Sequence, residues 1–493
     1  MISSLIYISV STPRFKISIN PADPRDMGVE ERLEDFEYLY NLVQENYPYL
    51  RLKERTHGYD WLGLKGVFEE RIRDASDNEV FLTVIVEAVE ALQNRHSQVL
   101  DPESVSEYNS RFQDSYPMNV VFCDEVAEVA GYWSPIYDTV MDRRRNLRFD
   151  VRIVYDRGDY IITDYYGSPL PGIGVKVTEV NGVPVDDAVK TCLDRDFFDW
   201  DFERGKSYLW RIAPHDFGAD AVFTVLGSTG QDADVTFHAS EGPSSFRILY
   251  PVPVVSFDKN EEEGVAYMYV KSFDLSTVEP YYDDVMDFYL EIEDYDFLII
   301  DIRGNTGGTF QTWVDGIVRP LIKEDKLHEY YLAYRTGDYV QRFHERWLSD
   351  RAEVSKDEFD YLPPEVHGDD YEIYNFSCTY TPTQAVGFEG EIILLTDNVV
   401  YSAAEGFTNF CKQTGFATIY GTPSGGDGFF VWPLYFVLPN SKIVVTMSSS
   451  MSLDSRGRAN EEARTRPDVL HESPFMAHDE LIDFVIEDIL KGR

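Results

Sequence analysis

The stretch Leu394-Leu395-Thr396-Asp397-Asn398-Val399-Val400-Tyr401-Ser402-Ala403-Ala404-Glu405 carries the clearest structural signal in this chain of 493 residues. Its beginning belongs to the apolar run Ile392 to Leu395, which is typical of a buried strand. A short loop follows, and Ser402 opens a predicted helix whose apolar face continues through Phe407, Phe410 and Cys411. A buried strand that leads through a loop into a helix is the repeating unit of α/β sheets, so this stretch predicts an α/β core.

Ser402 permits two interpretations. A serine at a helix N-terminus is most often an N-cap, whose hydroxyl accepts a hydrogen bond from the first helical turn. The same position places a nucleophile at the positive end of the helix dipole, with the N–H of Ala403 available to a developing oxyanion. The residues alone leave both interpretations open.

A second stretch, Asp301-Ile302-Arg303-Gly304-Asn305-Thr306-Gly307-Gly308, follows another apolar run, Phe297 to Ile302. Glycines at a strand end let the backbone turn sharply and present N–H groups to an anion or an oxyanion. The stretch lacks the Gly-Lys-Ser/Thr of a phosphate loop and the GxGxxG spacing of a dinucleotide fingerprint. An ordinary tight turn is the alternative.

Residues 29–115 predict an N-terminal helical unit, after a loose leader over residues 1–28 that is interrupted by prolines. One helix face is formed by apolar residues at a spacing of three and four, and Pro48 ends that helix; its residues are Leu33, Phe36, Tyr40, Val43 and Tyr47. Ser76 and Glu79 have the pattern of a capping box for a later helix. His96 follows that helix, and without further context it is a capping or solvated residue.

Residues 116–255 predict a β-rich region. Three stretches have strand character, and the last two form a hairpin around residues 156–159: Asn119 to Phe122, Asp150 to Tyr155, and Tyr160 to Tyr165. Asn181-Gly182 is a tight turn between two further strands. Residues 256–493 then form the predicted α/β core, with a polar and aromatic insertion at about 317–385.

The order of these motifs resembles the C-terminal-processing (tail-specific) and tricorn-core-like serine peptidases. The resemblance rests on the loop at 301–308, the helix start at Ser402, the glycine-rich stretch 421–428 and the Pro-Asp segment at 466–469. Residues 172–185 look like the PDZ-like module of the family. The resemblance covers most of the chain from about residue 30, without the insertion. It implies an α+β multidomain fold with a helical unit, a PDZ-like module and a ClpP/crotonase-like core.

The resemblance also indicates how the serine is activated. Asp427 stands where the tail-specific branch has the lysine that acts as a base, and Lys412 lies about three helical turns beyond Ser402, so a Ser-Lys dyad is not expected. Tyr47-Pro48, Trp61 and Asn94-Arg95-His96 resemble the branch of the tricorn core and the interphotoreceptor retinoid-binding protein repeats. This resemblance implies that His96 is the general base.

The same pattern implies the remaining members of the site. Glu461, six residues before the Pro-Asp, would orient His96, with Glu462 adjacent to it. Gly307 or Gly308, together with Ala403, would hold the oxyanion through backbone N–H groups. The chain departs from the pattern at two positions: Arg95 replaces a helper serine, and Arg464 replaces the usual glycine of a Glu-x-x-Gly segment.

The resulting hypothesis is a serine endopeptidase that cleaves proteins or peptides through an acyl-enzyme. The alternative is a catalytically inactive ligand- or peptide-binding protein on the same scaffold. The substrate would be a peptide or an unfolded protein. We expect no cofactor and no metal, because HExxH is absent and the histidines outside the site show no ligand spacing.

Charge and cysteine content exclude several other classes. With 87 acidic and 44 basic side chains the formal charge is −43, which disfavours nucleic acid and anionic membrane surfaces as partners. The four cysteines are far apart and without CxxC, which argues against a zinc ribbon or a disulfide scaffold. The N-terminus is a poor signal peptide and no window is apolar enough to span a membrane, so a cytoplasmic location is the default expectation. Export is the alternative if the start of the chain is misassigned.

Overall fold

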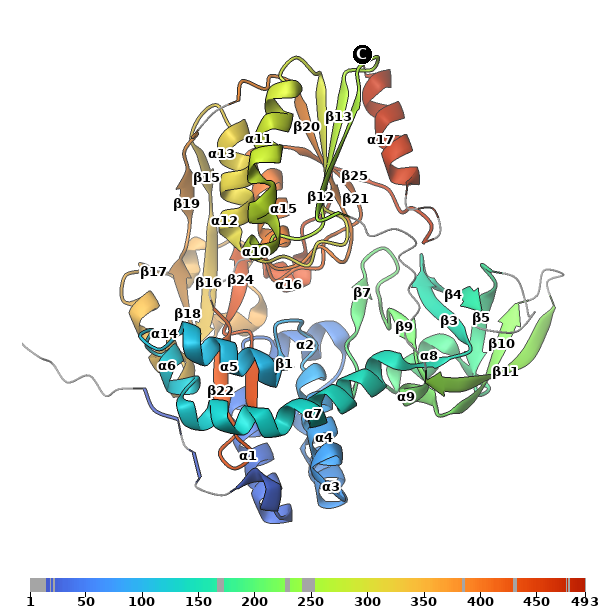
Figure 1. The fold of residues 1–493 in the computed structure, drawn as a ribbon, viewed down its shortest axis with the longest axis vertical. Coiled ribbons are helices and arrows are strands. Elements are labelled where there is room, and N and C mark those ends of the chain that lie inside the picture. Colours follow the sequence, from blue (N-terminus) through green and yellow to red (C-terminus); the bar gives the residue numbers. More distant parts are fainter. Residues whose placement is uncertain are drawn as a thin grey trace, which may run out of the picture.

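The computed structural model describes residues 15–17, 19–20, 23–165, 173–226, 231–241, 253–383, 386–428, 432–475, 477 and 479–492. Residues 1–14 of the predicted leader, Gly172 at the start of the PDZ-like segment and residues 384–385 of the insertion lie outside them. Figure 1 shows a mixed α/β chain in three parts: the helical unit in blue and cyan, the β module in green, and the α/β core in yellow to red.

Seven α-helices build the helical unit: α1 (Val29–Asn46), α2 (Leu50–His57), α3 (Lys65–Arg73), α4 (Asn78–Glu90), α5 (Pro102–Arg111), α6 (Met118–Val121) and α7 (Asp124–Asn146). The predicted first helix is confirmed, and it buries Phe36, Leu39 and Val43 on one face. Asp77, not Ser76, caps α4, because its carboxylate accepts from the N–H of Val80 at 2.9 Å.

The strand predicted at Asn119 to Phe122 is wrong, because these residues lie in and next to helix α6. Four apolar residues cannot by themselves distinguish a strand from a buried helical turn. Met118, Val121 and Phe122 are buried in the same core as the preceding helices. Helix α7 then continues to Asn146, so the first strand of the β module begins only at Leu147.

The β module forms one antiparallel sheet in the order β2-β11-β10-β5-β4-β3-β9, with β6 on β5. Its strands are β2 (Leu147–Phe149), β3 (Val151–Asp156), β4 (Asp159–Tyr165), β5 (Lys176–Val180), β6 (Val183–Pro184), β9 (Arg211–Ile212), β10 (Asp220–Leu226) and β11 (Asp232–Glu241). A small hairpin, β7 (Asp199–Asp201) and β8 (Lys206–Tyr208), and two helices, α8 (Val185–Lys190) and α9 (Pro214–Phe217), accompany the sheet.

Both turns predicted in this module are confirmed. Asp156 pairs with Asp159 at the end of the β3–β4 hairpin. Asn181 and Gly182 both have positive φ, at 52° and 75°, and connect β5 to β6. An Asn-Gly pair adopts this backbone readily, which explains why the sequence identifies the turn.

The α/β core is a six-stranded sheet in the order β12-β13-β14-β20-β21-β25, in which only β12 is antiparallel to its neighbour. Its strands are β12 (Val255–Asn260), β13 (Val265–Val270), β14 (Phe297–Asp301), β20 (Glu391–Thr396), β21 (Thr418–Gly421) and β25 (Val469–Leu470). The main helices are α11 (Tyr282–Glu291), α12 (Phe310–Trp313), α15 (Ala403–Thr414) and α17 (Glu480–Lys491). Helix α17 covers one face of the sheet, while α11, α12 and α15 pack in the core on the other (Figure 1).

The insertion at about 317–385 joins the core to the helical unit. It contributes β15 (Lys326–His328), β16 (Tyr330–Arg335), α14 (Asp338–Leu348), β17 (Glu353–Val354), β18 (Tyr371–Asn375) and β19 (Cys378–Tyr380). Strand β16 pairs with β24 (Ser450–Asp454), and its apolar side chains share one buried core with α1 and α4. The insertion therefore packs between the two units and contributes to their contact; it is not a separate lobe.

The strand after His96 makes a second connection between these units. Strand β1 (Gln98–Val99) pairs with β23 (Val444–Met447), which pairs with β22 (Leu434–Val437). All four cysteines are free thiols. No helix among the described residues is both long and apolar enough to cross a bilayer.

Candidate functional site

Ser402 lies on a sharp turn between strand β20 and helix α15. Its backbone is at φ 56° and ψ −126°, which a residue with a side chain adopts only under strain. The loop is held by two contacts to the glycine-rich stretch: Ser402 N–H donates to Gly426 O at 3.3 Å, and Gly425 N–H donates to Val400 O at 2.6 Å. The Ser402 hydroxyl does not cap the helix. It lies 3.0 Å from Nε2 of His96 instead.

His96 reaches this serine from the helical unit, 306 residues earlier in the chain. Its backbone is fixed on both sides, because its N–H donates to Asn94 Oδ1 at 3.0 Å and its carbonyl accepts from Thr446 Oγ1 at 2.9 Å. Thr446 belongs to β23, the strand that pairs with β1. The His96 ring packs on the Tyr401 ring, with centroids 4.9 Å apart. The docking of the two units thus sets the position of the imidazole.

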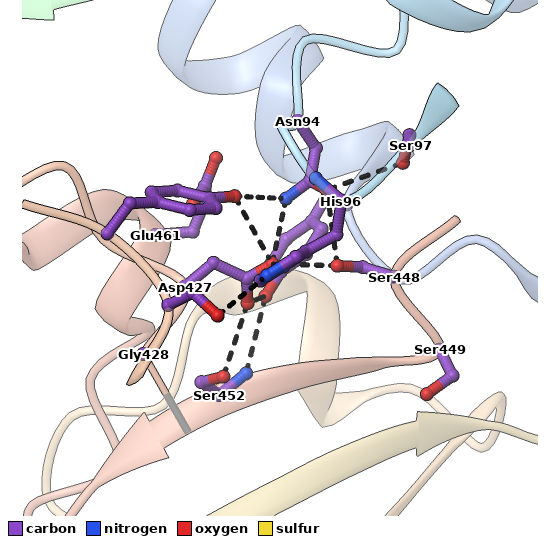
Figure 2. A network of polar contacts seen from close by, with 12 residues as sticks. Asn94, His96, Ser97, Asp427, Gly428, Ser448, Ser449, Ser452 and Glu461 are labelled. Atoms are coloured by element: carbon purple, nitrogen blue, oxygen red, sulfur yellow. Dashed lines mark hydrogen bonds and ion pairs between the residues drawn. The ribbon is translucent and has the colours of Figure 1, made fainter. Parts of the chain in front are cut away.

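Asp427 is the carboxylate that contacts His96, with Oδ2 2.9 Å from Nδ1 (Figure 2). The same oxygen accepts from Asn94 Nδ2 at 2.9 Å and from Ser448 Oγ at 2.7 Å. The other oxygen accepts from Tyr49 Oη at 2.7 Å and from Ser452 Oγ at 3.3 Å. With Tyr401 Oη, which donates to Oδ2 at 3.5 Å, six partners orient this one side chain.

The charge of Asp427 follows from these contacts. Burial opposes the charged form, but the hydrogen bond and charge of His96, together with Asn94 and Tyr49, outweigh it and hold the pKa of Asp427 below its ordinary value. An ionised carboxylate only accepts hydrogen bonds, so His96 Nδ1 is the donor. In the neutral ring Nε2 is then the acceptor for the Ser402 hydroxyl, which is the arrangement that activates a serine as a nucleophile.

Glu461, which the family resemblance placed next to His96, pairs with Lys53 in the structure. Its Oε1 lies 2.6 Å from Lys53 Nζ in a buried ion pair, with side-chain exposures of 2% and 4%. Glu461 lies beside the network in Figure 2, and no dashed line joins it to His96. Glu462 faces outward and pairs with Arg55 at 2.7 Å. The neighbouring lysine engages Glu461, and the position at Nδ1 is filled by Asp427.

The glycine loop lies against the nucleophile. A Cβ on Gly307 would be 2.7 Å from Tyr401 O and 2.8 Å from Ser402 Cβ, and the φ of this residue is +103°. The Gly307 N–H already donates to Asn305 Oδ1 at 2.9 Å. The backbone bonds to Phe273 use Gly307 O and Thr309 N, so the Gly308 N–H stays outside that bridge. Ala403, as the first residue of α15, has an N–H with no partner inside the helix.

Among the described residues, one group with metal-ligating atoms lies outside this site. Asp196, His215 and Asp216 bring ligand atoms within 4.8 Å of one another. His215 Nε2 is 3.0 Å from Asp196 Oδ2 and 3.4 Å from Asp216 Oδ2. Hydrogen bonding and charge from these aspartates outweigh the burial that opposes protonation and raise the pKa of His215, which accounts for the cluster as an ion-paired group.

The sequence reasoning missed the role of Asp427 while singling out its position. The chain has Gly425-Gly426-Asp427-Gly428 where the tail-specific branch has a lysine between glycines. The sequence feature that indicates this residue is an ionisable side chain between two glycines, in the loop that bonds the backbone of Ser402. In this structure the Asp427 carboxylate contacts His96 Nδ1, so it is placed to orient this histidine.

The chain is similar to one protein family and to several solved structures. Residues 264–471 match the model of peptidase family S41. Among solved structures, mature CPAF has a TM-score of 0.56 at 14% identity, with 94% of this chain and 97% of that chain covered. CPAF complexed with lactacystin gives 0.55 at 14% identity over 94% and 97%. The photosystem II D1 C-terminal processing protease gives 0.39 at 13% identity over 90% and 93%. No curated protein has significant sequence similarity to the chain.

Proposed function

We propose that the chain is a serine endopeptidase of family S41, whose model matches residues 264–471, and that its catalytic triad is Ser402, His96 and Asp427. The observation that carries the proposal is the continuous line of contacts from Ser402 Oγ through both nitrogens of His96 to Asp427 Oδ2, at 3.0 and 2.9 Å. The substrate is a protein or peptide, as the family implies.

The reaction follows from the roles of the two ring nitrogens. Ser402 Oγ attacks the carbonyl carbon of the scissile bond while its proton passes to His96 Nε2. The C–N bond then breaks, and the same proton goes to the leaving amine. In the second half, His96 Nε2 takes a proton from a water molecule, which attacks the acyl-enzyme carbonyl. The ester bond to Ser402 then breaks, and His96 returns the proton to Ser402 Oγ. Asp427 stays ionised throughout and stabilises the imidazolium that forms in each half of the reaction.

We assign the oxyanion hole to the N–H groups of Gly308 and Ala403. Gly307 supports the hole indirectly, because its own N–H is bonded to Asn305 and its lack of a side chain lets the loop approach Ser402. Backbone donors that are fixed before the reaction stabilise the tetrahedral intermediate without reorganisation.

The finer fold assignments belong to the same proposal. We infer that the β module is PDZ-like and binds or gates a peptide terminus, and that the six-stranded core is of the ClpP/crotonase type. The β5–β6 turn at Asn181-Gly182 and the short helix α8 after it support the first inference. The alternative of an inactive binding protein is disfavoured, because the nucleophile, base and acid are all in contact.

Labelling with a fluorophosphonate probe tests the triad. The folded chain should be labelled at one serine, and Ser402→Ala should abolish the labelling. His96→Ala should slow it by about 10³-fold or more, because the base is lost. The matched control is Ser276→Ala. This serine is also in the first turn of a helix, α10 (Leu275–Val278), and its hydroxyl bonds Asp274 at 2.5 Å. Labelling that persists in folded Ser402→Ala would refute the assignment.

A further inference from the structure

A pocket of about 330 Å³ lies where the β module meets the α/β core. Its wall includes Val399, which precedes Ser402 by three residues, and Gly425, which bonds Val400. The pocket wall is therefore no farther from the nucleophile than three residues of extended chain. A peptide with its scissile bond at Ser402 can reach this pocket within a few residues.

The buried carboxylates of the pocket wall are already engaged. Asp199 pairs with Arg95 at 2.7 Å, and Asp201 pairs with Arg204 at 3.1 Å. Asp397, at the end of β20, accepts from the N–H groups of Gly304 and Val399, each at 3.0 Å. These carboxylates are therefore already bonded to groups of the protein.

Arg464 is different from the other cationic residues of the pocket. Arg157 lies 3.4 Å from Asp156, and Arg303 lies 2.6 Å from Asp301. Arg464 makes no ion pair with any carboxylate in the described part of the chain, and its buried Nε has no hydrogen-bond acceptor there. The nearby Glu405 uses Oε1 for Asn460 and Thr465, at 2.5 and 2.6 Å. Arg464 thus lies close enough to Glu405 to interact with its charge, but it forms no ion pair with that carboxylate among the described residues.

The backbone of Arg464 adds a second, independent observation. Its φ is +52°, a conformation that favours glycine, and glycine is the usual residue at this point of the family pattern. Its side chain packs on Gly426, where a Cβ would lie 2.7 Å from Arg464 Cδ. Gly426 accepts the N–H of Ser402 and precedes Asp427. The chain thus tolerates backbone strain to hold an unpaired cation beside the nucleophile loop.

One aromatic ring lies near this cation, and others line the same pocket. The guanidinium carbon of Arg464 lies 5.9 Å from the centroid of the Phe202 ring, and Trp200 and Trp210 also line the pocket. Such walls favour an apolar group next to the anion. A guanidinium prefers a planar carboxylate, which it can bind with two parallel hydrogen bonds.

We propose that this pocket is a substrate subsite in which Arg464 binds a carboxylate of the peptide, next to an apolar residue that packs on the aromatic wall. The carboxylate is either the α-carboxylate of a peptide C-terminus or an acidic side chain. The inference rests on the proposed function, since it assigns the pocket to the substrate of the Ser402 site.

Binding to the folded Ser402→Ala variant tests the proposal without requiring turnover. The probes are three fluorescein-labelled peptides: Gly-Ala-Ala-Phe-Ala-Ala as the free acid, the same peptide as the C-terminal amide, and an amide with Glu as its last residue. At least one carboxylate probe should bind about tenfold or more tightly than the uncharged amide, as a charge-assisted hydrogen bond allows. The probe with the higher affinity identifies the source of the carboxylate.

Arg464→Gly should remove this difference and leave the affinity for the uncharged amide unchanged. The matched control is Arg157→Gly, which changes the same residue type in the same pocket at a similar positive φ of 46°. Glycine suits the backbone of both positions, so both variants should fold. Equal affinity for all three probes, or a difference that persists in Arg464→Gly, would overturn the proposal.

The experiments distinguish a failure of the proposed subsite from a failure of the proposed triad. Fluorophosphonate labelling of Ser402 without any preference for the carboxylate probes would refute the subsite and keep the triad. A carboxylate preference that depends on Arg464, in a chain that the fluorophosphonate does not label, would refute the triad and keep the binding pocket.

Discussion

At the scale of single residues, the site depends on which of two buried carboxylates faces the imidazole. Asp427 accepts six hydrogen bonds, one of them from His96. Glu461 is neutralised by Lys53 at 2.6 Å. A carboxylate that orients a histidine must stay ionised and stay in one position. Asp427 meets both conditions, because its pKa is held low and its two oxygens are bonded from several directions.

Asp427→Asn should therefore lower kcat by about 10³- to 10⁴-fold, because an amide favours the wrong tautomer of His96. Glu461→Gln should leave kcat within about tenfold while lowering the stability, since it removes one charge of a buried pair. Steady-state kinetics on a peptide substrate, at a temperature where circular dichroism shows both variants folded, measures the two effects. A larger loss of kcat in Glu461→Gln than in Asp427→Asn would return the orienting role to Glu461.

At the scale of elements, three loops meet at the carboxyl ends of parallel strands. The loop after β14 carries the glycines, the loop after β20 carries Ser402, and the loop after β21 carries Asp427. Parallel strands place their C-terminal loops along one edge, so the topology brings together groups that are far apart in the chain. The close approach of the first two loops requires a glycine at 307.

Gly307→Ala should lower kcat by about 10²-fold or more, because the new methyl group displaces Ser402 from His96. Gly304→Ala is the matched control in the same loop. Its φ is also positive, at +75°, but a Cβ there meets no atom within 4 Å. It should cost some stability and keep kcat within about tenfold. Equal kinetic losses in the two variants would show that backbone strain, and not the contact with Ser402, limits the loop.

At the scale of the whole molecule, the site exists only while the helical unit is docked on the core. His96 comes from one unit, and Ser402 and Asp427 come from the other. The β1–β23 pairing, the Tyr49–Asp427 bond and the Lys53–Glu461 pair all cross this boundary. The last of these is a buried ion pair, which costs desolvation energy and is strongly destabilising when only one partner is removed.

Lys53→Met should lower the free energy of unfolding by about 3 to 5 kcal/mol, because it leaves the Glu461 carboxylate buried without a counter-charge. The double variant Lys53→Met/Glu461→Met should regain most of this loss, since no isolated charge remains. Urea unfolding followed by circular dichroism compares the parent, both single variants and the double variant. A double variant as unstable as Lys53→Met would mean that packing, and not charge, is lost at this boundary.

The sequence by itself determined the local elements, and the tertiary structure decided how they combine. The strand–loop–helix around Ser402 and the turn at Asn181-Gly182 are visible in the chain, because periodicity and turn chemistry act between neighbours. The strand predicted at Asn119 to Phe122 is a helical turn in the structure, because four residues are too few to show a helical or a strand period. Only the resemblance to a family implies that His96 is the general base, because its own sequence neighbourhood does not indicate this role. The choice of Asp427 over Glu461 depends on where Lys53 lies after docking, and such contacts between distant segments leave no local pattern to read.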